Sequence, residues 1–156
     1  MWRIPSTCLS RWKLRRYRRL IENVLAKDCG TARCDGLRLS KFSSRLEICW
    51  RARDIHPWDR NRPLERRAAL FVEQSLADTE GVITRLFDSL PQLVVIDLAV
   101  REPESEENML AGTVLRSAWM SSRRLLSVQM RLREQGVDYR LAGSSFEPLG
   151  ADRSIA

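Results

Sequence analysis

Residues 92–101 constrain the fold more than any other part of the chain. Alternate positions are occupied by Val94, Ile96, Leu98 and Val100, and the residues between them are nearly as apolar. A strand with two apolar faces is buried on both sides, so it belongs in the middle of a sheet. The chain must therefore supply neighbouring strands and at least one layer that covers the sheet.

The segments around this strand carry the periodicities of further elements. Apolar residues alternate in the strand candidates and recur with a period of 3.6 in the helix candidates, and Pro91 ends the longest helix. A loop of seven residues joins the second strand to the third, which predicts a hairpin. The predicted elements are strands at 45–51, 92–101, 109–116 and 137–141, and helices at 63–90 and 117–135.

The order of these elements is strand, helix, strand, strand, helix, strand. This order is typical of the ferredoxin-like fold, an α+β sandwich of two split βαβ units. We therefore expect a four-stranded antiparallel sheet with both helices on one face. The right-handed crossover rule predicts that each helix crosses a neighbouring strand.

The positive charge of the chain lies in its first third. The 156 residues carry 27 basic and 20 acidic side chains, a net charge of +7. Up to Arg53 there are 14 basic and four acidic residues (+10), and the remainder has 13 basic and 16 acidic residues (−3). The charge therefore belongs to an N-terminal arm and not to the predicted core.

The arm contains one predicted helix, residues 10–27, whose apolar residues form a stripe with helical period. Residues 28–44 are rich in small and polar residues, which indicates a linker. We expect a basic arm and linker at 1–44, a core domain at 45–147 and a tail at 148–156. The predicted nucleic-acid-binding residues are the basic ones of this helix: Arg11, Lys13, Arg15, Arg16, Arg18 and Arg19.

The composition of residues 1–36 suggests an alternative origin for the arm. These residues are rich in Arg, Cys and Ser, as translated GC-rich upstream DNA is. A start placed too early in the reading frame is therefore one interpretation of the arm. An amphipathic basic helix would also suit an anionic membrane surface.

His56 is the only histidine, and it lies between a predicted strand and the long helix. Asp54 and Asp59 are close to it in sequence, and a histidine with a neighbouring carboxylate can act as a general base. The alternative is structural, because Pro57 and Trp58 are typical of a fixed loop. His56, Asp54 and Asp59 are therefore candidate catalytic residues for a small hydrolase or transferase.

Other chemistry is weakly represented in the sequence. Cys8, Cys29, Cys34 and Cys49 lack the paired spacing of a zinc site, so we expect no metal and no cofactor. Asp97 on the central strand invites comparison with metal-dependent nucleases, but the next strand has no acid and no lysine. We interpret Asp97 as a solvated residue or the partner of an arginine.

These observations favour a small non-enzymatic domain that acts by binding or self-association. Its basic arm would contact nucleic acid or another polyanion, and its sheet could pair with a second copy in a homodimer. No apolar run approaches the roughly 18 residues that a transmembrane helix needs. Free thiols in a chain of this composition fit a reducing environment, so we expect a cytoplasmic protein.

Overall fold

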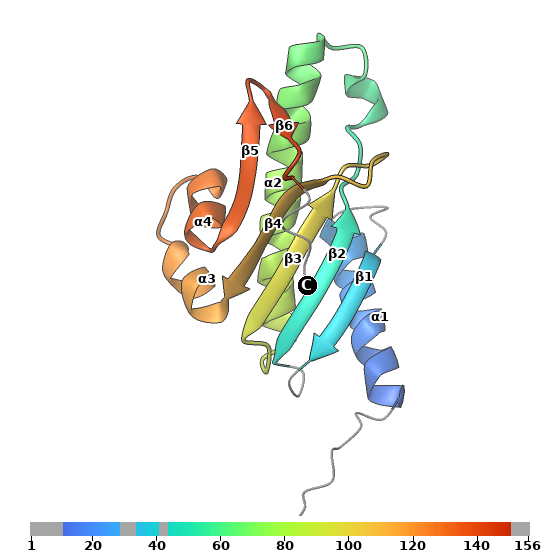
Figure 1. Cartoon of the computed structure of the whole chain (residues 1–156), viewed down its shortest axis with the longest axis vertical. Coiled ribbons are helices and arrows are strands. Elements are labelled where there is room, and N and C mark those ends of the chain that lie inside the picture. Colours follow the sequence, from blue (N-terminus) through green and yellow to red (C-terminus); the bar gives the residue numbers. More distant parts are fainter. Residues whose placement is uncertain (1–10, 29–33, 41–43, 151–156) are drawn as a thin grey trace, which may run out of the picture.

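The structure is a computed structural model that describes residues 11–28, 34–40 and 44–150 (Figure 1). The fold is mixed α+β, as predicted. The helices are α1 (Arg11–Asp28), the 3₁₀ turn η1 (Pro57–Asp59), α2 (Leu64–Ser89), α3 (Arg116–Ser122) and α4 (Val128–Glu134). The strands are β1 (Cys34–Ser40), β2 (Arg45–Arg51), β3 (Val95–Arg101), β4 (Asn108–Leu115), β5 (Val137–Ala142) and β6 (Ser145–Glu147).

The strands follow one another across the sheet in the same order as in the chain. Strands β1 to β5 form the main sheet, and the short β6 pairs with the outer half of β5. All neighbouring pairs are antiparallel except β2 and β3, which are parallel along seven residue pairs from Arg45–Val95 to Arg51–Arg101. Helix α2 makes the long connection that a parallel pair requires.

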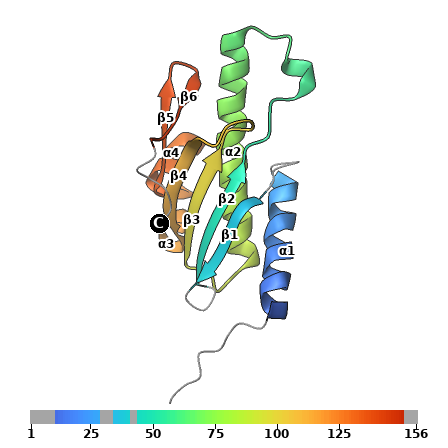
Figure 2. The ribbon, with the colours of Figure 1, turned by 45° about the vertical axis from the view of Figure 1, so that its right-hand side comes forward.

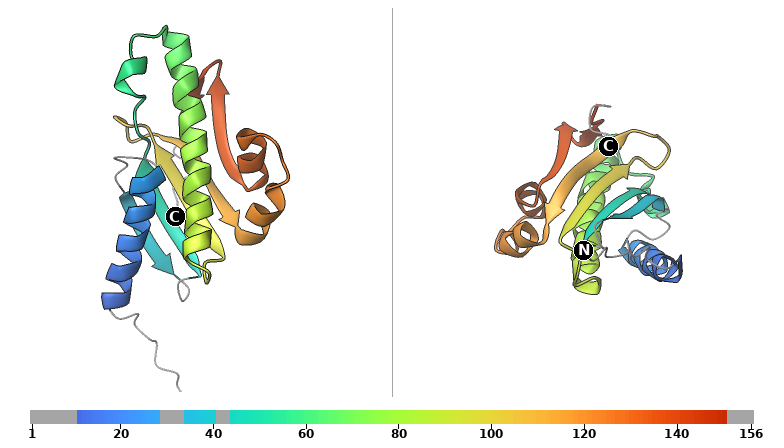
Figure 3. Two further views of the ribbon diagram at one scale, coloured as in Figure 1. Left: turned by 180° about the vertical axis from the view of Figure 1, so that it is seen from behind. Right: turned by 60° about the horizontal axis from the view of Figure 1, so that its bottom comes forward.

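Helices cover one face of this sheet. Seen from behind, α1 and α2 lie across the sheet in opposite directions, and α3 and α4 lie beside β4 and β5 (Figure 3). The core forms between these layers from alternate strand residues and from the apolar stripes of α1 and α2. Its largest fully buried side chains are Trp50, Phe87, Ile21, Leu25, Leu46, Ile48, Leu76, Ile83, Leu86, Leu93, Ile96 and Leu98.

The ferredoxin-like arrangement is not confirmed. A split βαβ unit has a strand inserted between its two parallel strands, whereas β2 and β3 are direct neighbours. The other edge of β2 is already paired with β1. The last long strand, β5, therefore pairs with β4 and not with β2.

Three further differences from the sequence analysis concern the secondary structure elements. The segment predicted as a linker contains β1, whose positions 37 and 39 pair with Ile48 and Leu46. The helix predicted over 117–135 is two short helices, because Ser127 caps a new helix by accepting a hydrogen bond from the Met130 N–H at 3.1 Å. Strand β6 lies at the end of the expected core domain, where no strand was predicted.

Helix α1 is part of the same packed unit as the strands. Ile21, Val24 and Leu25 are buried and belong to one hydrophobic cluster with Leu46 and Ile83. Residues from the expected arm and residues from the expected core domain thus share one core. Within the expected tail, Leu149 is buried and forms an isolated bridge with Asn108.

Two glycines allow β4 and β5 to approach closely. A Cβ atom on Gly112 would lie 2.1 Å from the Gly136 carbonyl oxygen. Gly136 itself has a φ of +96°, which side chains rarely adopt, and a Cβ there would lie 2.6 Å from the Thr113 carbonyl oxygen. The start of β5 therefore depends on the absence of a side chain at both positions.

Helix α2 is longer than the sheet that it covers. Its 26 residues span about 39 Å, while the seven residues of β3 span about 23 Å. The first turns of α2 extend past the sheet next to the β5–β6 hairpin (Figure 1). There Phe146 packs edge-on against Phe71 and Tyr139, with ring centroids 6.1 and 6.2 Å apart.

Candidate functional site

Helix α1 presents four exposed arginines on the side away from the core. We call Arg15, Arg16, Arg18 and Arg19 the arginine face. The helical period places them opposite the buried side chains, because the buried and basic positions occupy complementary arcs of the helix. Among them, Arg18 forms an ion pair with Glu22 at 3.0 Å.

Arg11 and Lys13, which were also predicted to bind nucleic acid, belong to α1. Their side chains lie outside the part of the chain whose side chains the structure describes. The first turn of α1 contains no acidic residue. The partial positive charge of a helix N-terminus therefore adds to the basic side chains, and an anionic partner would stabilise this end of the helix.

The arginine face is held in place by contacts on the other side of α1. The Gln92 side-chain amide donates a hydrogen bond to the Tyr17 hydroxyl at 2.9 Å. Ile21 and Leu25 are at most 1% exposed, so the middle and the C-terminal half of α1 are anchored in the core. The guanidinium groups therefore project from a docked helix.

The three candidate catalytic residues lie together in the exposed segment between β2 and α2, but their side chains do not bond to one another. Asp54 pairs with Arg60 at 3.2 Å, and Asp59 pairs with Arg62 at 2.6 Å. His56 Nδ1 accepts a hydrogen bond from the Trp58 N–H at 3.3 Å. Both carboxylates are engaged by arginines, so no carboxylate orients His56 as a general base.

Asp97 is the buried partner of an arginine, as the sequence interpretation allowed. Its carboxylate accepts two hydrogen bonds from Arg45, at 2.6 and 2.9 Å, and one from the Thr113 hydroxyl at 2.6 Å. The hydrogen bond with Asp97 and the attraction between the two charges hold the pKa of Arg45 above its ordinary value. The bidentate pair ties β3 to β2, and the Thr113 hydroxyl ties β3 to β4. Together these bonds leave few lone pairs of the carboxylate for a metal.

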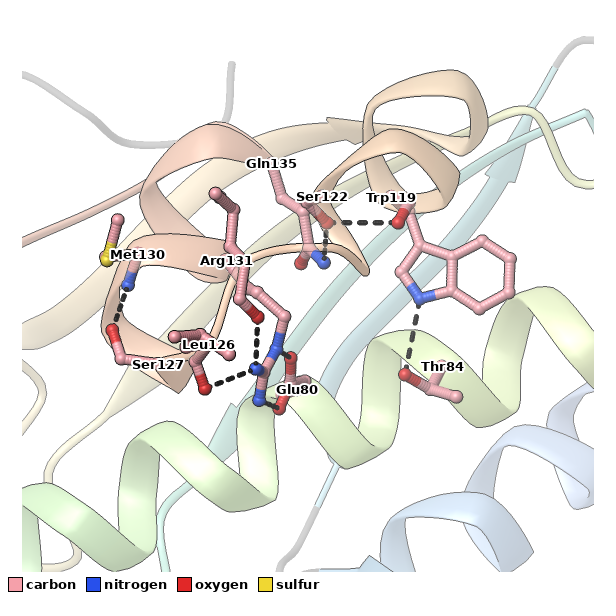
Figure 4. Close-up of polar contacts among 10 residues, drawn as sticks. Glu80, Thr84, Trp119, Ser122, Leu126, Ser127, Met130, Arg131 and Gln135 are labelled. Atoms are coloured by element: carbon pink, nitrogen blue, oxygen red, sulfur yellow. Dashed lines mark hydrogen bonds and ion pairs between the residues drawn. The ribbon is translucent and has the colours of Figure 1, made fainter.

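A second polar cluster joins α2, α3 and α4 (Figure 4). The Gln135 amide donates to the Ser122 hydroxyl at 2.8 Å, and the Trp119 indole N–H donates to the Thr84 hydroxyl at 3.2 Å. Arg131 bonds to the Glu80 carboxylate and donates to the Leu125 and Leu126 carbonyl oxygens.

These bonds tie α3 and α4 to α2, to each other and to the loop between them. The hydrogen bond with Glu80 is the main reason that the pKa of Arg131 is raised. Ser122 has an amide and not a base as its neighbour, so it is not activated as a nucleophile. We therefore assign this cluster a structural role.

Metal binding finds no support in the described part of the chain, where no three His, Cys, Asp or Glu side chains are grouped to hold an ion. Of the four cysteines, Cys8 and Cys29 lie outside the described residues, and Cys34 lies on β1. Cys49 lies on β2 and is partly buried. Within the same described ranges, none of the helices has the length and apolarity needed to span a bilayer.

The chain matches no family model, no curated protein and no solved structure. Its function therefore has to be argued from the surface just described.

Proposed function

We propose that this protein is a non-enzymatic binding domain whose arginine face contacts an anionic polymer, with nucleic acid as the principal candidate. The observation that carries the proposal is the exposure of Arg15, Arg16, Arg18 and Arg19 on a helix whose opposite side is buried. Arginine suits this role because its planar guanidinium donates paired hydrogen bonds to phosphate oxygens.

Electrostatics determines how binding should depend on salt concentration. Each phosphate that a guanidinium neutralises releases condensed counterions, so binding weakens as salt rises. With about three to four phosphate contacts, the logarithm of the binding constant should fall with the logarithm of salt at a slope of roughly −3. The Arg18–Glu22 pair is exposed, and such a pair exchanges partners at a cost of about 1 kcal/mol or less.

The test is a salt titration of the full chain with duplex DNA. Replacing Arg15, Arg16, Arg18 and Arg19 by Gln should flatten the slope and weaken binding, while the melting temperature stays nearly unchanged because the four side chains are exposed. The control replaces four other exposed arginines by Gln and so removes the same net charge. These are Arg123, Arg124, Arg133 and Arg140, which lie outside α1. Equal losses in both variants, or no binding by the unaltered chain in dilute salt, would contradict the proposal.

The remaining expectations stay predictions. A homodimer through the sheet gains little support, because outward residues of β2 and β3 such as Arg45, Arg51 and Arg101 are charged and paired with acids. The enzymatic alternative at His56 lacks a bonded carboxylate. The expected cytoplasmic location rests on composition alone.

A further inference from the structure

The turn before α2 presents a tryptophan to solvent. Trp58, in the middle of η1, is 87% exposed. An exposed indole ring offers a large, flat aromatic face on which another molecule can stack. Leu64, at the start of α2, is also exposed (73%), but it lacks the flat aromatic face of Trp58.

The turn holds this tryptophan in a defined position. The Trp58 N–H donates to His56 Nδ1 at 3.3 Å, and the Asp59 N–H donates to the His56 carbonyl oxygen at 2.9 Å. The Gln74 side chain on α2 donates to the Arg53 and Asp54 carbonyl oxygens at 3.2 and 3.3 Å. His56 thus acts as the cap of the turn, and its ring packs edge-on against the indole with centroids 5.7 Å apart.

The surroundings of Trp58 are basic. Residues 53–67 contain five arginines and three acids, a net charge of +2. Arg60 and Arg62 are exposed and pair with exposed or partly exposed carboxylates. Such ion pairs are weak, so both arginines can exchange these carboxylates for a phosphate group. Arg66, on the first turns of α2, is also exposed.

The turn and the arginine face lie on the same edge of the molecule. Figures 1 and 2 both place η1 beyond the C-terminal end of α1, on the β1 side of the sheet. Along the helix, Arg19 is nine residues from Asp28, which is about 14 Å. Turn η1 lies beyond this end of α1, so a flexible polyanion that continues past the helix would meet an aromatic platform there.

We propose that Trp58 is a base-stacking site and that the polyanion is therefore a single-stranded nucleic acid. Its phosphates would contact the arginine face and the arginines around η1, while one base stacks on the indole. Paired bases within a duplex are already stacked and would not reach Trp58. This inference rests on the proposed function, since the arginine face supplies the sequence-independent part of the affinity.

The experiment compares an oligothymidylate of about 16 nucleotides, near the upper end of typical single-strand sites, with a duplex of the same length. Trp58→Ala should weaken binding of the single strand by roughly 5- to 150-fold, the usual loss for one stacked base. Trp58→Phe should retain most of the affinity because it keeps an aromatic face. Leu126→Ala is the control, since it removes another exposed apolar side chain (96%) from a different edge.

Duplex binding separates this inference from the proposed function. If Trp58→Ala leaves single-strand binding unchanged, or weakens duplex and single strand equally, the stacking site is wrong while salt-dependent duplex binding still supports the arginine face. If the unaltered chain binds neither nucleic acid, the proposed function is wrong and the stacking site falls with it. Because Trp58 is exposed, all variants should melt at nearly the same temperature.

Discussion

At the scale of single residues, two glycines determine how closely β4 and β5 can approach. Gly112 lies on β4 opposite Val137, and Gly136 immediately precedes β5. The backbone of residue 136 occupies the space where a side chain at position 112 would begin. The two glycines therefore fix how β5 joins the sheet, and their spacing in the sequence gives no sign of this contact.

Gly112→Ala should destabilise the protein by about 3 kcal/mol, since the new methyl group would displace backbone and not a flexible side chain. Urea unfolding followed by circular dichroism measures this change. Gly150→Ala is the matched control, because no atom lies within 4 Å of the position of its Cβ, and it should change stability by less than about 0.5 kcal/mol. Similar midpoints for the two variants would contradict the close approach.

At the scale of elements, α1 links the basic surface to the core. A helix with one apolar stripe needs a surface to cover, and here that surface is formed by α2 and the β1 side of the sheet. Ile21 is fully buried in this contact. The arginine face therefore depends on packing for its orientation as well as on helix formation.

Ile21→Ala should cost roughly 2–5 kcal/mol in the free energy of unfolding, as other large-to-small changes in cores do. Asn23→Ala, on the exposed side of the same helix, should be nearly neutral. Thermal melts of both variants measure the difference. Equal melting temperatures would mean that α1 is not docked on the core in solution.

The helices and strands also show which parts of the fold could be predicted from the sequence. Strong periodicity predicted β2, α2, β3, β4 and the helix that carries the arginine face. Strand β1 was missed because it alternates only over Leu37 and Leu39 and contains Gly36 among polar residues. The break between α3 and α4 has no Gly or Pro to mark it.

The candidate sites also differ in whether the sequence predicts them. The arginine face follows from periodicity, since buried and exposed sides of a helix can be read from spacing. The exposure of Trp58 does not follow, because a tryptophan in a loop is usually packed, and only the surrounding structure determines whether it is. The ion pairs of Asp54 and Asp59 depend equally on how the turn folds.

At the scale of the whole molecule, packing is uneven along α2. The seven residues 64–70 of α2 include no buried side chain, and the first one is Val72. Farther along, Val82, Ile83 and Leu86 are fully buried against the sheet. The extending turns are instead flanked by the β5–β6 hairpin, through the contacts of Phe146.

The overhang of α2 should make the molecule open locally from one end. Amide protons of residues 68–72 should exchange with solvent deuterium faster than those of residues 80–87, because local opening there uncovers little apolar surface. Hydrogen–deuterium exchange followed by mass spectrometry measures both segments in one experiment, and equal protection would contradict this expectation. Gln74 ties the turn that holds Trp58 to this same stretch of helix. A bound single strand should therefore slow exchange at the overhang, so that the less protected end of α2 reports ligand binding.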